Sequence, residues 1–325
     1  MEIVQKINLL KAKENLRGKV KRTPLMMSSE INELVGCKVY FKCENFQKTG
    51  SFKARGAFNA AINKLAQNKN KYSKIVAHSS GNHAAALAYV GKQLGLKTVV
   101  IMPSNSSEYK KENVLKYGAE IIECEPGIEN REKALKDFLE NNKALPIHPY
   151  DDEEVICGQS VCAQEIFEDI PNLDILLSPI GGGGLISGCC LASFYFSNST
   201  KIYGAEPAGA DEAYRSFHTK SLQKNLTTST IADGLLANIS QRNFEIINQY
   251  VEDILLVSDE NIIEAMILLF EKLKIVAEPS SCVPFAALLN NKEKFYNKTV
   301  AVIISGGNIS IEQFCELTKK RGYKI

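Results

Sequence analysis

The sequence predicts an α/β protein with two open twisted sheets, in which a small domain is inserted into a larger one. From about residue 75, short apolar runs alternate with longer amphipathic segments, and the alternation starts again with bigger pieces after residue 149. Strands and helices that alternate in this way form parallel sheets with right-handed crossovers. We expect a small domain at residues 74–151 and a large domain formed by residues 1–73 and 152–325.

The expected small domain is built from short strands and amphipathic helices. Its apolar runs predict strands at residues 74–78, 97–102, 120–124 and 144–148. Apolar positions at helical spacing predict helices at residues 82–94, 107–117 and 130–141. Gly118 follows the second of these helices, where glycine is a usual stop signal.

The expected large domain repeats this alternation. Helices are predicted at residues 155–167, 185–196, 244–250 and 260–272, and strands at residues 173–179, 201–205, 253–257 and 299–304. A looser segment runs from residue 207 to residue 238. The first 70 residues contain a helix, a strand-like run at 38–43 and a helix after Lys53. Because they are too few to form a core of their own, we expect them to join the C-terminal half.

Composition excludes several classes of protein. The 325 residues include 39 Lys+Arg and 37 Asp+Glu, a net charge of +2, which argues against nucleic acid as a main partner. The longest apolar stretches are interrupted by charges before the ~20 residues that a membrane span needs. The nine cysteines form no CxxC pair and suit reduced thiols, and the first residues lack the layout of a secretory signal. We therefore expect a cytoplasmic protein without a membrane partner.

Lys53 is a candidate reactive lysine. It lies in the segment KTGSFKARG at the start of a predicted helix, beside Phe52 and after Ser51. Burial and the positive end of the helix both disfavour a protonated amine, so its pKa should fall. A lowered pKa is what a Schiff-base or general-base lysine requires. The alternative is an ordinary exposed helix lysine.

Three other segments place polar or glycine-rich turns after predicted strands. They are SSGNH at residues 79–83, GGGGL at 181–185 and SGGN at 305–308. The first suits a carboxylate and the second a phosphate, because both lie before a helix N-terminus; the alternatives are a common cap and a flexible turn. The third is a weak signal alone. Cys189 follows Gly188 where a P-loop needs lysine, and no glycine completes the dinucleotide motif.

In this order and spacing, SFKARG, SSGNH, GGGGL and SGGN resemble the fold-type II pyridoxal-phosphate (PLP) enzymes of the serine/threonine dehydratase group. Within that group the chain is most similar to the eukaryotic serine racemases. The resemblance covers essentially the whole chain, and it includes RTPL at residues 22–25, GQS at 158–160 and EPSS at 278–281. It implies the tryptophan synthase β-like fold and a homodimer.

The resemblance also implies roles for individual residues. Lys53 would carry the cofactor as a Schiff base. The cofactor phosphate would be held by Gly181, Gly182, Gly183, Gly184 and Leu185, the ring hydroxyl by Asn82 and the pyridine nitrogen by Ser305. The substrate carboxylate would meet Ser79, Ser80, Asn82 and His83, with Arg131 closing from the small domain. His83 could equally be structural, as we expect for His148 and His218.

Ser80 is the residue on which the predicted reaction depends. Racemisation requires acid/base groups on both faces of the α-carbon, and in the racemases a lysine and a serine at these positions supply them. Plain threonine dehydratases of the group usually have alanine where this chain has Ser80. We expect a racemase that interconverts L-serine and D-serine through Lys53 and Ser80 and also eliminates water and ammonia from serine to give pyruvate.

Two further sites are implied by the resemblance. A Mg²⁺ ion, or Ca²⁺ or Mn²⁺, would be bound by Glu206, the Ala210 carbonyl and Glu212, where the racemases usually have Asp at the last position. The alternatives are a ribose-binding acid or surface carboxylates. ATP would act as an effector at Ser28, Ser29, Lys48, Thr49, Tyr117, Lys274 and Asn308. Glu30, Ala85 and Tyr150 depart from the pattern of that nucleotide site, so its effect should be weak or absent.

Three other functions stay open at this point. One is an L-serine/L-threonine dehydratase, against which Ser80 argues. Another is a non-catalytic ligand-binding relative, against which Lys53 argues, because a sensor needs no Schiff base. An NAD oxidoreductase is the most distant, given the glycine spacing.

Overall fold

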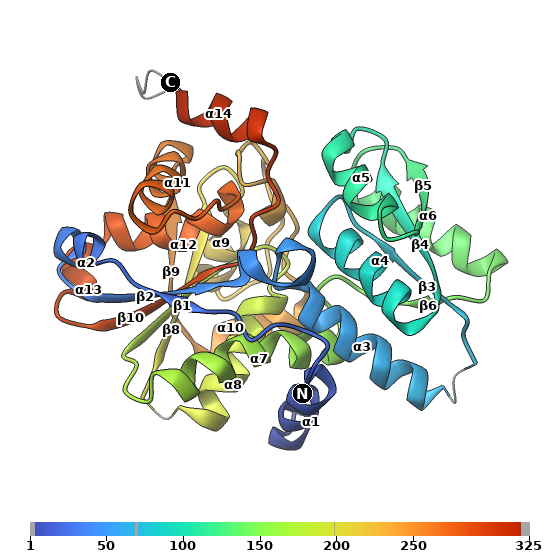
Figure 1. Cartoon of the computed structure of the whole chain (residues 1–325), viewed down its shortest axis with the longest axis horizontal. Helices are drawn as coiled ribbons and strands as arrows, with labels where there is room; N and C mark the ends of the chain where they lie inside the picture. Colours follow the sequence, from blue (N-terminus) through green and yellow to red (C-terminus); the bar gives the residue numbers. More distant parts are fainter. Residues whose placement is uncertain (1–3, 69–70, 198, 320–325) are drawn as a thin grey trace.

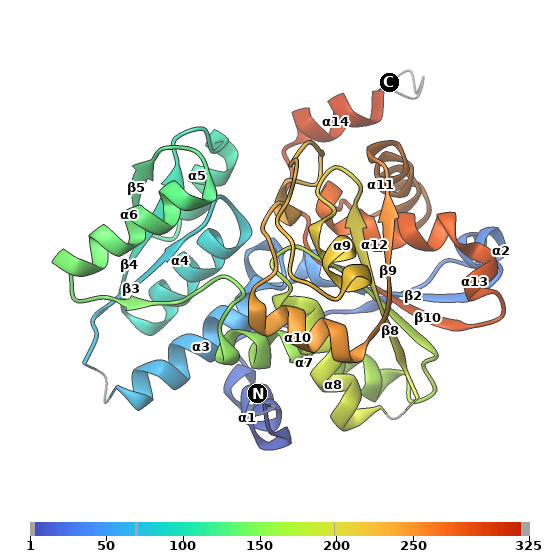
Figure 2. The same ribbon diagram turned by 180° about the vertical axis from the view of Figure 1, so that it is seen from behind.

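The computed structural model describes residues 4–68, 71–197 and 199–319. Its strands form two sheets, a six-stranded sheet in the order β1-β2-β10-β7-β8-β9 and a four-stranded sheet in the order β5-β4-β3-β6. Each sheet belongs to one of the two lobes seen in Figures 1 and 2. The predicted α/β class is confirmed, with the smaller unit inserted into the chain of the larger one.

The smaller lobe is a parallel sheet with helices on both faces. Its strands are β3 (Lys74–His78), β4 (Lys97–Pro103), β5 (Glu120–Cys124) and β6 (Leu145–Pro146), and its helices are α4 (Asn82–Leu94), α5 (Glu108–Leu115) and α6 (Ile128–Asn141). Helices α4 and α5 cover one face through an apolar cluster that includes Ala88, Val100 and Val114. Helix α6 covers the other face around Val99 and Ile101.

Strand β6 is shorter than the run at residues 144–148 predicts. It pairs with β3 only at Leu145 and Pro146, and the Ile147 amide then donates to the Val76 carbonyl over 2.9 Å. Proline has no N–H to donate to a sheet, so it is tolerated in an edge strand, and Pro146 is exposed there. The chain leaves the sheet at this point and crosses to the larger lobe.

The larger lobe has its sheet between two layers of helices. Its strands are β1 (Leu25–Met26), β2 (Lys38–Cys43), β7 (Ile175–Pro179), β8 (Lys201–Pro207), β9 (Val251–Val257) and β10 (Thr299–Ile304). Only β1 pairs antiparallel among these strands. The side chains of central strand β10 alternate between two apolar clusters, Ala301 and Ile303 facing one and Val300 and Val302 the other. That alternation is typical of a strand buried on both faces.

The helices of the larger lobe divide between these clusters. They are α1 (Lys6–Leu16), α2 (Ser29–Val35), α3 (Lys53–Gln67), α7 (Glu153–Asp169), α8 (Gly184–Phe196), α9 (Glu212–Thr219), α10 (Gln241–Tyr250), α11 (Asp259–Leu273), α12 (Pro279–Asn290), α13 (Lys292–Phe295) and α14 (Ile311–Lys319). Helices α1, α3, α7, α8 and α10 lie on one side of the sheet, and α2, α11 and α12 on the other.

Two expectations about the chain as a whole can be compared with the structure. All nine cysteines are free thiols, and seven of them are buried. None of the helices in the described ranges is both long enough and apolar enough to cross a bilayer.

A buried ion network fixes the start of α3. The Arg55 guanidinium donates to both carboxylate oxygens of Glu44 and to both of Glu165, with every N···O distance at 2.8 Å. Lys42 adds a second cation, at 2.6 Å from Glu165. The side chains of Arg55, Glu44 and Lys42 have no exposed area. Arg55 lies two residues after Lys53, so the network ties the first turn of α3 to β2 and α7.

Replacing Arg55 should strongly destabilise the fold. In Arg55→Ala two carboxylates lose their main partner while buried, and breaking a buried ion pair in this way costs about 3–5 kcal/mol. Urea unfolding followed by circular dichroism measures the loss. Arg17→Ala, which breaks an ion pair between exposed side chains with Glu14, is the matched control and should change stability by less than about 1 kcal/mol. Equal effects of the two changes would contradict this account of the network.

Candidate active site

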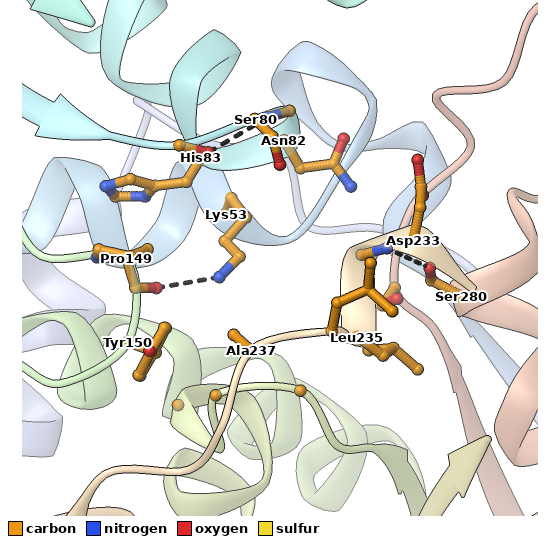
Figure 3. Close-up of a pocket in the computed structure, with 18 of the residues that line it drawn as sticks. Lys53, Ser80, Asn82, His83, Pro149, Tyr150, Asp233, Leu235, Ala237 and Ser280 are labelled. Carbon is orange, nitrogen blue, oxygen red and sulfur yellow. Dashed lines mark hydrogen bonds between the residues drawn. The ribbon is translucent and has the colours of Figure 1, made fainter. Parts of the chain in front are cut away.

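The predicted catalytic, cofactor and substrate residues line one cavity between the lobes. The cavity has a volume of about 180 Å³. Its walls include Lys53, Ser79, Ser80, Asn82, His83, Arg131, Gly181, Gly182, Gly183, Gly184, Leu185 and Ser305. These residues come from both lobes, and most lie where a parallel strand ends, the usual place for a ligand in an open α/β sheet. Figure 3 shows Lys53 near the centre of this group.

Lys53 is held at the cavity wall by its neighbours in the chain. Ser51 forms a bridge with Gly306, and the Phe52 amide donates to the Ser305 carbonyl over 3.0 Å. Helix α3 begins directly afterwards at Lys53, whose amine donates to the Pro149 carbonyl over 2.9 Å. Burial lowers the pKa of Lys53 from 10.5 to about 8, although the negative charge of Glu278 opposes this shift. The amine is therefore partly deprotonated near neutral pH.

The lowered pKa of Lys53 has a measurable consequence. Only a neutral amine attacks an aldehyde, so capture of added PLP by the cofactor-stripped chain should accelerate as pH rises from 7 to 9, with a midpoint near 8. The rate is followed by stopped-flow absorbance. An N-acetyl-lysine solution is the control, and its rate should still be rising at pH 10, because its pKa is about 10.4. A midpoint near 10 in the protein would contradict the pKa shift.

The glycine loop connects β7 to α8 and forms a cradle. Gly183 has φ +87°, a conformation that residues with side chains rarely adopt. A Cβ on Gly182 would lie 2.3 Å from the Tyr150 ring, so the backbone passes close under that ring. The first N–H groups of α8 have no partner within the helix and point out of its N-terminus, which is the positive end of the helix dipole. These features fit a phosphate bound by backbone amides.

The side chain of Asn82 lies in a chain of hydrogen bonds. It donates to Glu278 over 2.6 Å, and its oxygen accepts from Asn308 over 2.7 Å. Asn308 also donates to the Thr49 carbonyl over 2.8 Å. Burial raises the pKa of Glu278 to about 7, so this carboxyl carries little charge below neutral pH. Glu278 is a site residue that the sequence did not predict.

Ser305, which also lines the cavity, faces a second serine. Its hydroxyl lies 3.0 Å from that of Ser281, which in turn donates to the Gly306 carbonyl over 2.6 Å. Neither serine carries a charge. A group placed against Ser305 would therefore meet a neutral hydroxyl rather than a carboxylate.

The segment at residues 79–83 turns into α4 at the cavity. The Ser79 hydroxyl accepts from the Gly81 amide over 3.3 Å, and Ser80 is partly exposed to the cavity. In Figure 3, Ser80 lies on the side of Lys53 away from Pro149. His83 is buried, with Nε2 at 3.0 Å from the Ile147 carbonyl, and burial lowers its pKa to about 3. It is a neutral imidazole that fixes the crossing segment.

The cavity also has charged groups at its small-lobe side. Arg131 on α6 has an Nε that is buried without a hydrogen-bond partner in the described chain. Lys110 on α5 forms an ion pair with Asp233 of the 3-10 turn η3 (Asp233–Leu235), across the cavity mouth. The sequence did not predict Lys110, Asp233, Pro149 and Tyr150 as residues of this cavity, although Asp233 lies in the family motif ADG at residues 232–234.

The predicted metal ligands lie outside this cavity. Glu206, at the end of β8, accepts from the Ala213 and Tyr214 amides, and Glu212 accepts from the Ile239 amide over 2.7 Å. Burial raises the pKa of both carboxyls, that of Glu212 to about 7. The second oxygen of Glu212 is buried without a partner in the described chain. No cluster of three or more His, Cys, Asp or Glu side chains suited to a metal occurs in the described ranges.

The predicted nucleotide residues fall into two groups. Thr49 and Asn308 share a hydrogen bond, while Lys48 lies over the Tyr89 ring, which packs against Tyr117. Ser28 caps α2, which contains Ser29, and Lys274 ends α11. None of these seven residues lines the cavity that contains Lys53.

Comparison with known proteins identifies the class to which this fold and cavity belong. The family described as "Pyridoxal-phosphate dependent enzyme" matches residues 16–306. The chain therefore belongs to the PLP-dependent enzymes of fold type II, and its relatives place it among their racemases and ammonia-lyases.

Relatives of both activities match almost the whole chain. A β-hydroxyaspartate dehydratase of Paracoccus denitrificans is 40% identical over 94% of this chain and 96% of its own length. A serine racemase of Dictyostelium discoideum is 39% identical over 95% of this chain and 96% of its own length. The structure of maize serine racemase superimposes with a TM-score of 0.91 at 37% identity and covers 97% of both chains. These identities do not separate the two activities.

Proposed function

We propose that the chain is a serine racemase that interconverts L-serine and D-serine and also converts serine to pyruvate and ammonia. The observation that carries the proposal is the position of Ser80, a hydroxyl that shares one cavity with the Lys53 amine. A dehydratase needs only one acid/base group at the α-carbon, whereas a racemase needs one on each face. Ser80 supplies the second.

The cavity residues fit a bound PLP. The glycine loop and the start of α8 would hold its phosphate, Lys53 its aldehyde carbon and Ser305 its ring nitrogen. When bound, the cofactor supplies an electron sink for the α-carbon of an amino acid. Asn82 would hydrogen-bond the ring hydroxyl from its position beside Glu278.

The chain's own groups then move the protons. Lys53, with a pKa of about 8, exchanges a proton at the α-carbon on one face. Ser80 exchanges a proton on the opposite face. Ser79, Asn82 and His83 lie around the position proposed for the substrate carboxylate, and Arg131 covers it from α6. Because Ser305 is neutral, the ring nitrogen gains no full proton from it, which suits racemisation and elimination over transamination.

A second candidate function is ammonia-lyase action on 3-hydroxyaspartate. Arg131 brings a cationic group to the small-lobe side of the cavity, and its buried Nε lacks a partner in the described chain, whereas Lys110 is paired with Asp233. A second carboxylate on the substrate would pair with such a group. By sequence identity, the relatives named for hydroxyaspartate support this second function as strongly as the serine racemases support the first function.

One experiment separates the two functions. The purified chain is incubated with L-serine and, separately, with L-threo-3-hydroxyaspartate, and each sample is analysed for chirality, ammonia and 2-oxo acid. D-serine together with pyruvate from L-serine supports the racemase. Rapid formation of oxaloacetate and ammonia from hydroxyaspartate, with no D-serine from L-serine, would instead establish the lyase.

The metal site is proposed at Glu206, the Ala210 carbonyl and Glu212. Two buried carboxyls with raised pKa values, one with an orphaned oxygen, are suited to a divalent cation that would neutralise them. Mg²⁺ should raise the melting temperature of the parent chain. Glu206→Gln should lose this response, and an unchanged response would remove the site from this position.

Three other features are proposed from the same family resemblance. ATP would act weakly at Ser28, Ser29, Lys48, Thr49, Tyr117, Lys274 and Asn308, which an ATP titration of activity tests. We also propose a homodimer in the cytoplasm. Exposed Phe46, Phe270, Val276 and Ile311 offer apolar area for such an interface, and light scattering would give the mass in solution.

A further inference from the structure

We propose that Asn243 is a positioning residue that fixes the distance between the glycine loop and the segment that holds the Lys53 amine. The segment is residues 147–151, which cross from the small lobe to the large one. This inference rests on the proposed PLP contacts of the glycine loop and Lys53. It assigns no chemical step to Asn243, whose side chain contacts the glycine loop and segment 147–151.

The side-chain amide of Asn243 joins the two structures directly. Its Nδ2 donates to the Gly182 carbonyl over 2.7 Å and to the Tyr150 carbonyl over 3.3 Å. The first acceptor belongs to the glycine loop and the second to segment 147–151. A Cβ on Gly183 would lie 2.8 Å from the Cβ of Asn243, so the loop also rests on this side chain. The Tyr150 ring packs directly against Gly182, and the buried amide of Asn243 adds hydrogen bonds that hold the carbonyls of the loop and the segment in register.

Segment 147–151 transmits this position to the lysine. Pro149, next to Tyr150, provides the carbonyl that accepts from the Lys53 amine over 2.9 Å. The turn is rigid, because His148 Nδ1 accepts from the Asp151 amide over 2.8 Å and from the Tyr150 amide over 3.3 Å. Moving the Tyr150 carbonyl would therefore move the Pro149 carbonyl with it. Asn243 therefore contacts the phosphate cradle directly, and it reaches the reactive amine through segment 147–151.

The burial of the Asn243 side chain is unfavourable for the stability of the fold. Its side chain has no exposed area, and its Oδ1 is buried without a donor in the described residues. An aliphatic side chain would avoid this orphaned oxygen. Helix α10 is in turn fixed at its start, where Ser240 caps the Asn243 amide and Glu212 accepts from the Ile239 amide. The amide is thus presented from a rigid element, as a positioning residue requires.

Two substitutions separate loss of the donor from a change of charge. Asn243→Leu removes both hydrogen bonds without adding charge. Asn243→Asp keeps the shape but sets oxygens against the Gly182 and Tyr150 carbonyls. Asn248→Leu is the matched control, since Asn248 lies on the same helix and its side chain accepts a hydrogen bond from the exposed Lys220. Circular dichroism and urea unfolding of each cofactor-stripped full chain show whether it folds.

The readouts are binding of PLP and the pH dependence of its capture, neither of which needs turnover. We expect about a tenfold weaker PLP affinity in Asn243→Leu and a larger loss in Asn243→Asp, because a buried carbonyl without its donor distorts the loop. In both variants the midpoint for capture should move upward from about 8, since a freed segment lets water reach Lys53. Asn248→Leu should match the parent in both.

Folded Leu and Asp variants with the parent's affinity and midpoint would overturn the positioning role. Weaker binding with an unchanged midpoint would also overturn it, because the amide would then support the phosphate loop alone. A parent chain that binds PLP but leaves serine and hydroxyaspartate unchanged would contradict the proposed function. The comparison of PLP affinity and capture midpoint between the Asn243 variants and the parent would still hold. A parent that fails to bind PLP would overturn both proposals.

Discussion

Lys53→Ala should remove nearly all turnover of amino acids and the absorbance band at about 410 nm that a protein-bound PLP gives. The amine serves both as the proposed attachment point and as one of two acid/base groups, so a single change removes two functions. A loss of at least about 10,000-fold in kcat is expected, since one acid/base group alone contributes about 100- to 10,000-fold. Absorbance spectroscopy and a pyruvate assay measure the two effects.

The control for this change is Lys92→Ala. Lys92 lies exposed in the last turn of α4, away from the cavity wall, so this variant should keep the band and the activity. Borohydride reduction of the parent followed by peptide mapping identifies the attached lysine. A label on any lysine other than Lys53 would contradict the assignment, even if Lys53→Ala were inactive for structural reasons.

Every strand except the two-residue β1 could be predicted, because each of the others lies in a short apolar run between turns. Buried strands β3, β7 and β10 begin or end within two residues of the predicted limits. The inserted arrangement followed from the break in the pattern after His148-Pro149. The one strand that is much shorter than predicted is β6. Pro146 has no backbone N–H to donate to the sheet, and a prediction based on apolar runs does not take this into account.

Helices α9 and α12 were not predicted from the sequence. Helix α12 has buried residues on every side from Pro279 to Leu288, so its sequence has no amphipathic repeat. Helix α9 lies in the segment expected to be loose, because it has only eight residues. The missed α12 matters for the site, since Glu278 is the residue before its first turn.

The residues of the candidate site also fall into those that the sequence could predict and those that it could not. Its glycine and serine turns are local, so their spacing could indicate an anion site and a reactive lysine. Glu278 and Tyr150 line the cavity, and Asn243 contacts its glycine loop, only because distant segments meet there. None has a sequence signal beyond its own identity, although EPSS includes Glu278. The tertiary fold brings these residues to the site, and their spacing along the sequence does not reveal it.

Ser80→Ala should separate the two reactions that we propose for this cavity. Formation of D-serine from L-serine should fall by at least about 100-fold, because one face of the α-carbon loses its acid/base group. Conversion of L-serine to pyruvate should stay within about threefold of the parent, since elimination needs only the Lys53 face and protonation of the leaving hydroxyl. Chiral amino-acid analysis and a pyruvate assay on the same sample give both rates.

The elimination rate is the internal control for this variant, because it depends on the same cofactor, the same lysine and the same substrate carboxylate contacts. Deuterium oxide adds a test of the faces. In Ser80→Ala, L-serine should still gain deuterium at the α-carbon through Lys53, while D-serine should not. If both enantiomers exchanged at the parent's rates, some other group would serve the second face. If both reactions fell together, Ser80 would be acting in substrate binding instead of in proton transfer.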